Sequence, residues 1–91
     1  PSLIRKSGLD RNYCYQIFDG RKRPSRDKVL ALCFAMHLSF TEVQNLLKAT
    51  GYPILYARIE RDSAIIFSLQ RNCALSDVNE LLYELGYKEL A

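Results

Sequence analysis

A short helix predicted over residues 10–18 carries side chains that could read nucleic-acid bases. Asp10 can cap this helix, and Gly20 supplies a left-handed residue just beyond its end. Arginine, asparagine and glutamine suit bidentate contacts with guanine or adenine edges in a major groove. The candidate base contacts on the face turned away from the packing residues are Arg11, Asn12, Tyr15 and Gln16. The alternative is an ordinary solvated helix face.

The loop that follows this helix has the composition of a phosphate-binding segment. It places three cations directly before a helix N-terminus, whose backbone N–H groups also favour phosphate. The candidate phosphate contacts are Arg21, Lys22, Arg23 and Ser25. Because Pro24 disfavours helix in the residue before it, we expect the cations to stay in a loop.

The charge of the chain is concentrated in its N-terminal part. The 91 residues include 13 basic and 10 acidic side chains, for a net charge of +3. Residues 1–28 hold eight basic and three acidic side chains, whereas residues 29–91 hold five and seven. A basic end on a mildly acidic body favours a polyanionic partner, although a merely solvated basic surface is the alternative.

Size and composition exclude several classes of protein. With 48% apolar and 25% charged residues, the chain is typical of a small globular domain with one core. No run approaches the roughly 18 apolar residues of a membrane span, and no leader is visible, so we expect a cytoplasmic protein. Three scattered cysteines and a single histidine predict reduced thiols, with no metal site and no cofactor. We find no group of side chains that supports catalysis, and we expect no enzyme activity.

Caps and periodicity predict an all-α chain. A short helix over residues 3–6 precedes the helix at 10–18, and Ser25 caps a helix from 26 to about 37. That helix is apolar around most of its circumference, which predicts a central, largely buried position. Ser39 and Glu42 match the capping-box pattern and open a helix that ends at 49 or 50.

The C-terminal part is also predicted to be helical. We expect one helix from about 56 to 70, with a break near 61–62, and a last helix capped by Ser76 that ends at Gly86. Several carboxylates in this part are interpreted as solvated helix faces: Asp62, Asp77, Glu80 and Glu84.

A sequence pattern recurs at an offset of 35 residues. Residues 43–52 and 78–87 share a valine, a Leu-Leu pair and a terminal Gly-Tyr pair. In both copies the glycine falls where a Schellman cap needs it, and the tyrosine can pack back on the second leucine. We interpret this as one helix-plus-cap unit used twice; independent convergence of two amphipathic helices is the alternative.

Residues 2–25 combine two short helices and a glycine-containing turn into a helix-turn-helix pattern. Four apolar residues are spaced to pack these helices together and onto the next helix: Leu3, Leu9, Cys14 and Ile17. The segment from Ser7-Gly-Leu-Asp to Gly-Arg-Lys-Arg-Pro-Ser25 resembles the lambda-repressor-like (XRE-type) helix-turn-helix family of DNA-binding regulators. That family shows a similar Ser-Gly turn, recognition helix and Gly-Lys/Arg-x-x-Pro-Ser tail.

The resemblance implies a lambda-repressor-like helix-turn-helix domain over residues 1–52, here without the first helix of the family. It implies a sequence-specific transcriptional regulator of double-stranded DNA, with residues 11, 12, 15 and 16 facing bases and 21, 22, 23 and 25 facing the backbone. Residues 53–91 are expected to form a C-terminal helical extension packed on that domain, which forms a homodimer or binds a protein partner. A protein-interaction module that retains the helix-turn-helix shape is the alternative function.

Overall fold

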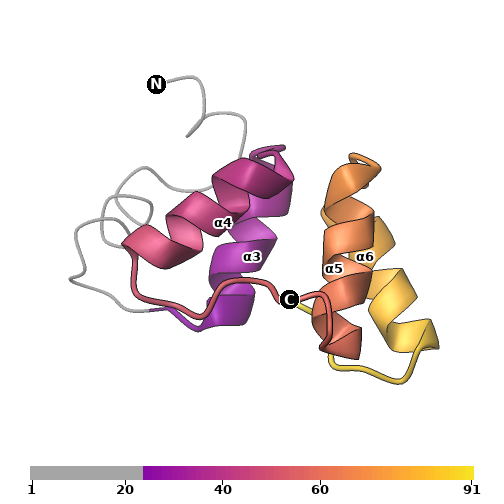
Figure 1. Cartoon of the computed structure of the whole chain (residues 1–91). Coiled ribbons are helices and arrows are strands. Elements are labelled where there is room, and N and C mark those ends of the chain that lie inside the picture. The colour runs from indigo at the N-terminus through magenta and orange to yellow at the C-terminus, as the bar shows by residue number, and fades with distance from the viewer. Residues whose placement is uncertain (1–23) are drawn as a thin grey trace.

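The computed structural model describes residues 24–91, and within this range it contains helices and no strands (Figure 1). The all-α expectation is therefore confirmed for the described residues. The helices predicted over 3–6 and 10–18 lie outside them. The four described helices are α3 (Arg26–Ala35), α4 (Phe40–Ala49), α5 (Glu60–Gln70) and α6 (Leu75–Glu84).

Two helical hairpins make up the described chain. In Figure 1, α3 and α4 lie together on one side and α5 and α6 on the other, joined by the α4–α5 linker. We call residues 24–55 the first hairpin and residues 60–90 the second hairpin. Contacts also cross between them, because α3 packs against α6 and α4 packs against α5.

The first hairpin begins its helices as the sequence predicted. The Ser25 hydroxyl accepts a hydrogen bond from the Lys28 amide at 3.2 Å, so Ser25 is the N-cap of α3. At α4, the Glu42 amide donates to the Ser39 hydroxyl at 3.2 Å, and the Ser39 amide donates to the Glu42 carboxylate at 2.8 Å. This reciprocal pair confirms the predicted capping box.

The prediction that α5 begins near residue 56 is wrong, and so is the predicted break at 61–62. The helix begins at Glu60 and continues without interruption through Arg61 and Asp62. The Tyr56 amide instead donates to the Asp62 carboxylate at 3.0 Å, and the Ile59 amide closes a turn on the Tyr56 carbonyl at 3.0 Å. These bonds hold residues 56–59 in a turn outside the helix.

Ser76 is not the N-cap of α6, as its sequence position suggested. The cap is Ala74, whose backbone is extended and whose side chain offers no acceptor. The Asp77 carboxylate accepts from the Ala74 amide at 3.1 Å, so only this half of a capping box is formed. The acidic residue of the first turn therefore decides where the helix begins.

All four described helices end in a Schellman motif. After α4 and α6 the left-handed residue is Gly51 or Gly86, as predicted, with φ of 82° and 84°. After α3 and α5 it is His37 or Asn72, with φ of 56° and 55°. In each case the two backbone bonds of the motif are present, as in Leu38 N–H to Cys33 O at 3.1 Å and His37 N–H to Phe34 O at 3.1 Å.

The 35-residue pattern is a structural repeat that covers both hairpins. The four left-handed residues recur at this offset, and so do the N-caps at Ser39 and Ala74. Gln44 bonds the backbone of Leu55 in both directions at 2.8 Å, and its counterpart Asn79 accepts from the Leu90 amide at 2.8 Å. One backbone design is therefore used twice.

The two hairpins are joined by a reciprocal pair of ion bridges. Arg26 of the first hairpin contacts Asp62 of the second at 3.0 Å, and Arg61 of the second contacts Asp27 of the first at 3.0 Å. Arg26–Asp27 and Arg61–Asp62 are themselves repeat equivalents. Such an exchange requires an approximate twofold relation between the hairpins.

The core lies along this twofold relation. Its most buried large residues come in equivalent pairs from the two hairpins: Leu30 and Ile65, Val43 and Val78, Leu47 and Leu82. Each pair contributes one side chain from each hairpin, so neither hairpin encloses a core alone. The two hairpins share one hydrophobic core.

We expect Asp62→Asn to lower the free energy of unfolding by roughly 3 kcal/mol, because the Asp62 carboxylate is almost fully buried and holds both the Arg26 guanidinium and the Tyr56 amide. The matched control is Asp27→Asn in the equivalent bridge, whose aspartate side chain is 21% exposed instead of 4%. It should cost about 1 kcal/mol or less. Urea unfolding measures both, and equal losses would contradict the assigned difference in burial.

Candidate functional site

Of the eight predicted DNA contacts, only Ser25 belongs to the described residues. The others lie outside them: Arg11, Asn12, Tyr15, Gln16, Arg21, Lys22 and Arg23. Ser25 is exposed, and its hydroxyl accepts the Lys28 amide while its carbonyl accepts the Val29 amide at 3.1 Å. Its hydroxyl hydrogen can therefore still be donated to an external acceptor such as a phosphate oxygen.

The start of α3 is held firmly to the rest of the body. Arg26 donates to the carbonyls of Pro53 and Ile54 at 2.9 and 3.2 Å and makes a bidentate contact with Asp62. The Tyr52 hydroxyl also donates to the Pro24 carbonyl. The bonds of Arg26 and the bond to Pro24 therefore fix the chain directly behind the cations of the loop.

The described body adds no positive charge of its own. Residues 24–91 contain seven basic and eight acidic side chains, a formal charge of −1. Arg26 and Arg61 are moreover neutralised by their partners Asp62 and Asp27. Residues 1–23 contain six basic and two acidic side chains, so the excess positive charge of this chain is concentrated there.

Helix α3 is buried on two faces, as its apolar circumference predicted. One face belongs to the main core through residues such as Leu30 and Phe34. The other carries Leu32 and Met36, only 3% and 6% exposed, which form a separate cluster against which Leu38 packs. Among the described residues, Leu38 is the one hydrophobic side chain that packs on this pair.

The equivalent face of α5 is open. Phe67 stands at the position of Leu32 and is 50% exposed, and Arg71 stands at the position of Met36. The Arg71 guanidinium lies over the Phe67 ring, 4.6 Å from its centroid. The two hairpins therefore differ at this face. It is apolar on the first hairpin, whereas an arginine lies over it on the second.

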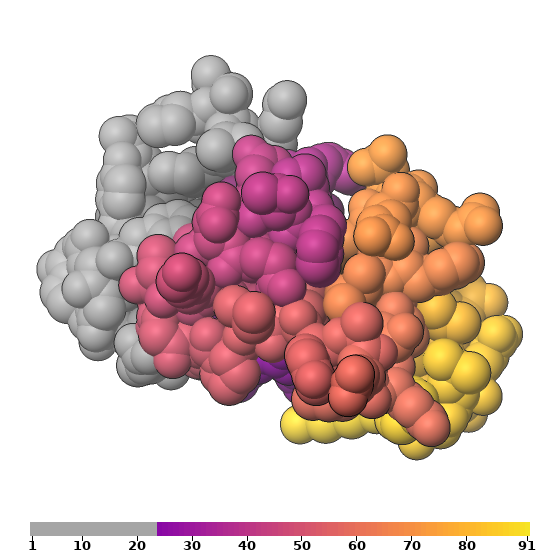
Figure 2. All heavy atoms as spheres, viewed as in Figure 1, coloured from indigo at the N-terminus to yellow at the C-terminus, as the bar shows by residue number. Residues whose placement is uncertain are grey.

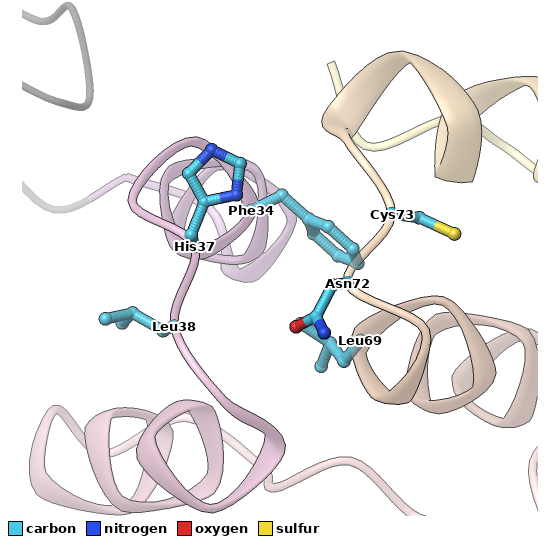
Figure 3. A pocket seen from close by; sticks show the side chains of 6 residues that line it. All are labelled: Phe34, His37, Leu38, Leu69, Asn72 and Cys73. Carbon is cyan, nitrogen blue, oxygen red and sulfur yellow. The ribbon is translucent and has the colours of Figure 1, made fainter.

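The hollow between the ends of α3 and α5 is too small for a ligand. It measures about 10 Å³, room for one water, and is lined by repeat-equivalent residues of both hairpins (Figure 3). In Figure 3 the Cys73 thiol points away from the His37 ring. Residues 24–91 contain no group of three or more His, Cys, Asp or Glu side chains that could hold a metal ion.

Two titratable groups have shifted pKa values, and each has a structural cause. Burial raises the pKa of the Cys33 thiol to about 12, so the thiol stays neutral. The pKa of the Tyr87 hydroxyl is raised because it donates a hydrogen bond to the Glu60 carboxylate. Tyr87 is the repeat equivalent of Tyr52, and both hydroxyls bond to the beginning of their own hairpin.

Sequence reasoning missed the Arg–Asp exchange between the hairpins. Asp62 was interpreted as part of a solvated face, but it is 3% exposed and accepts from Arg26 and the Tyr56 amide. The signal was present, because Arg-Asp occurs at 26–27 and again at 61–62 with the same 35-residue offset as the noted repeat.

Comparison with known proteins adds no family. No protein-family model matches the chain, and it has no match among curated proteins or solved structures. The resemblance to helix-turn-helix regulators therefore rests on the motif residues themselves. Among the described residues, no helix is long and apolar enough to cross a bilayer.

We expect Cys33 to resist alkylation in the folded protein from pH 7 to 9, because its thiol is inaccessible and its raised pKa keeps it protonated. The partly exposed Cys73 serves as the internal control and should react first. Peptide mapping after iodoacetamide treatment separates the two sites. Equal labelling of both before unfolding would contradict the tight packing around Cys33.

Proposed function

We propose that the protein is a sequence-specific DNA-binding transcriptional regulator that reads the major groove with the helix predicted at 10–18. The observation that carries this proposal is the fixed start of α3, directly behind the cationic loop. Ser25 caps the helix and Arg26 clamps it to Pro53, Ile54 and Asp62. A rigid platform at this point is what a phosphate-binding loop requires for precise placement.

The second buried face of α3 supports the same function. The apolar residues of the helix-turn-helix pattern are predicted to pack onto this helix, and Leu32 with Met36 offers an apolar surface outside the main core. We propose that this surface receives the helix-turn-helix segment. The described hairpins then serve as the scaffold that sets the orientation of the recognition helix.

The charge distribution orients the complex. Because the body carries a formal charge of −1, it gains nothing by approaching DNA. The basic residues 1–23 would face the duplex and the second hairpin would point away.

The function predicts two classes of substitution. Arg11→Ala or Gln16→Ala should weaken binding to the specific site by about 1–3 kcal/mol while sparing random DNA, because a base contact is lost. Lys22→Ala should weaken binding to both and reduce the steepness of the salt dependence by about one phosphate contact. Electrophoretic titrations of the whole protein at several salt concentrations measure both. If the two classes behave alike, the assigned recognition face is wrong.

The apolar surface of Leu32 and Met36 predicts a further pair of substitutions. Leu32→Ser should reduce affinity for any duplex by roughly tenfold or more, because it disrupts the surface on which the DNA-binding segment is proposed to pack. Phe67→Ser, at the equivalent exposed position, is the matched control and should leave affinity unchanged. Circular dichroism should show the helices of both variants retained. Wild-type affinity in folded Leu32→Ser would contradict the proposal that the DNA-binding segment packs on this surface.

A protein-interaction module is the second candidate, and one observation favours it. Near the end of α6, Tyr83 is 73% exposed and Leu85 is 53% exposed. If the whole protein binds no duplex even at low salt, this alternative replaces the regulator.

A further inference from the structure

The interface between the two hairpins is self-complementary. Each hairpin contributes an arginine and an aspartate, and each receives the opposite partner from the other hairpin. The same holds for helix packing, because α3 against α6 is matched by α5 against α4. An interface of this kind does not depend on whether its two halves belong to the same chain.

A first hairpin packs better against a second hairpin than two copies of the same hairpin pack against each other. Phe34 and Leu69 are repeat equivalents, and both line the hollow between the hairpins, with the Phe34 ring directed toward the second hairpin in Figure 3. Two first hairpins would bring two phenylalanines to this place, and two second hairpins would bring two leucines. A first hairpin paired with a second hairpin keeps one large and one smaller side chain.

A short exposed hinge joins the two halves. Leu55 is buried and held by Gln44, and α5 begins at Glu60, so the hinge consists of residues 56–59. All four of these residues are exposed. Within the hinge, the backbone bond is the turn from the Ile59 amide to the Tyr56 carbonyl. Opening the hinge breaks this turn and the bond from the Tyr56 amide to the Asp62 carboxylate, whereas the Arg26–Asp62 bridge can form again between chains.

Three large apolar side chains at this hinge are about half exposed. Ile54, Tyr56 and Ile59 are 48%, 52% and 52% exposed. The α4–α5 linker that carries them lies on the face shown in Figure 2. These three large apolar side chains fall within six consecutive residues of the chain, and each is about half exposed. If two hinges extended past one another, each would cover the apolar residues of the other.

We propose that the protein forms a domain-swapped dimer, in which the second hairpin of each chain packs on the first hairpin of a second copy. Both Arg–Asp bridges and the paired core are kept, now between chains, and the two hinges cross at the new interface. This inference goes beyond the proposed function and does not rest on it, because association is measured without DNA.

Hinge length gives the first test. Wild-type protein refolded at rising concentration should yield a growing fraction of a species of twice the mass in analytical ultracentrifugation. A variant without Ala57 and Arg58 cannot turn back on itself and should be a folded dimer throughout. A wild-type protein that stays monomeric at every concentration would overturn the proposal. So would a shortened variant that is a folded monomer or that stays unfolded.

Charge exchange gives a second, independent test. Asp27→Arg and Arg61→Asp in separate chains each place like charges against one another within the chain. Refolded together, a swapped pair restores both bridges. The arginine introduced at position 27 then meets the aspartate introduced at position 61, and the unchanged Asp27 meets the unchanged Arg61. Native mass spectrometry should therefore show a dimer with one copy of each variant, with the melting temperature raised toward the wild-type value.

The control for this test carries both substitutions in one chain. It restores the bridge within the chain, although not the Arg61 bonds to the Lys88 carbonyl, and should melt above either single variant, which shows that the reversed bridge is tolerated. If this control is stable and the mixture contains only separate monomers, the proposal is wrong. If the control does not fold, the shortened hinge decides the question.

Discussion

The ion bridge between Arg26 and Asp62 connects three separate parts of the described chain. Arg26 reaches the carbonyls of Pro53 and Ile54 as well as the Asp62 carboxylate, and Asp62 also accepts the Tyr56 amide. The beginning of α3, the linker and the first turn of α5 therefore meet at one pair of side chains. Since Asp62 is buried, its charge requires these donors.

The second bridge repeats this arrangement at the other end of the repeat. Arg61 contacts Asp27 and also donates through Nε to the Lys88 carbonyl at 3.0 Å, the equivalent of the Arg26 Nε bond to Pro53. Each arginine thus ties the tail of its own hairpin and the aspartate of the other. This double use explains why Arg-Asp occurs twice at the same spacing, and why the two hairpins close on each other without a long connection.

Local signals in the sequence predicted the local parts of the fold. The caps at Ser25 and Ser39 and the glycines at 51 and 86 each depend on residues within one helical turn, and all four positions are confirmed. The start of α5 was not predictable in this way, because the Asp62 carboxylate accepts the amide of Tyr56 six residues earlier, beyond the three-residue spacing of a capping box. The Arg–Asp bridges join residues 34 and 36 positions apart, which no turn-scale rule detects. The candidate DNA contacts come from the sequence alone, and the described residues contain only Ser25 and the start of α3.

The departures from the repeat carry more functional information than the repeat itself. The two hairpins agree in caps, bridges and core, where folding demands it, and differ on the outer faces of α3 and α5. Leu32 and Met36 are buried, whereas Phe67 is half exposed beneath Arg71. Burial of Leu32 and Met36 stabilises the protein by several kcal/mol relative to a state in which water reaches both side chains. An apolar outer face on the first hairpin alone is therefore consistent with a scaffold in which only that hairpin holds the proposed DNA-binding segment, while the second hairpin completes the core.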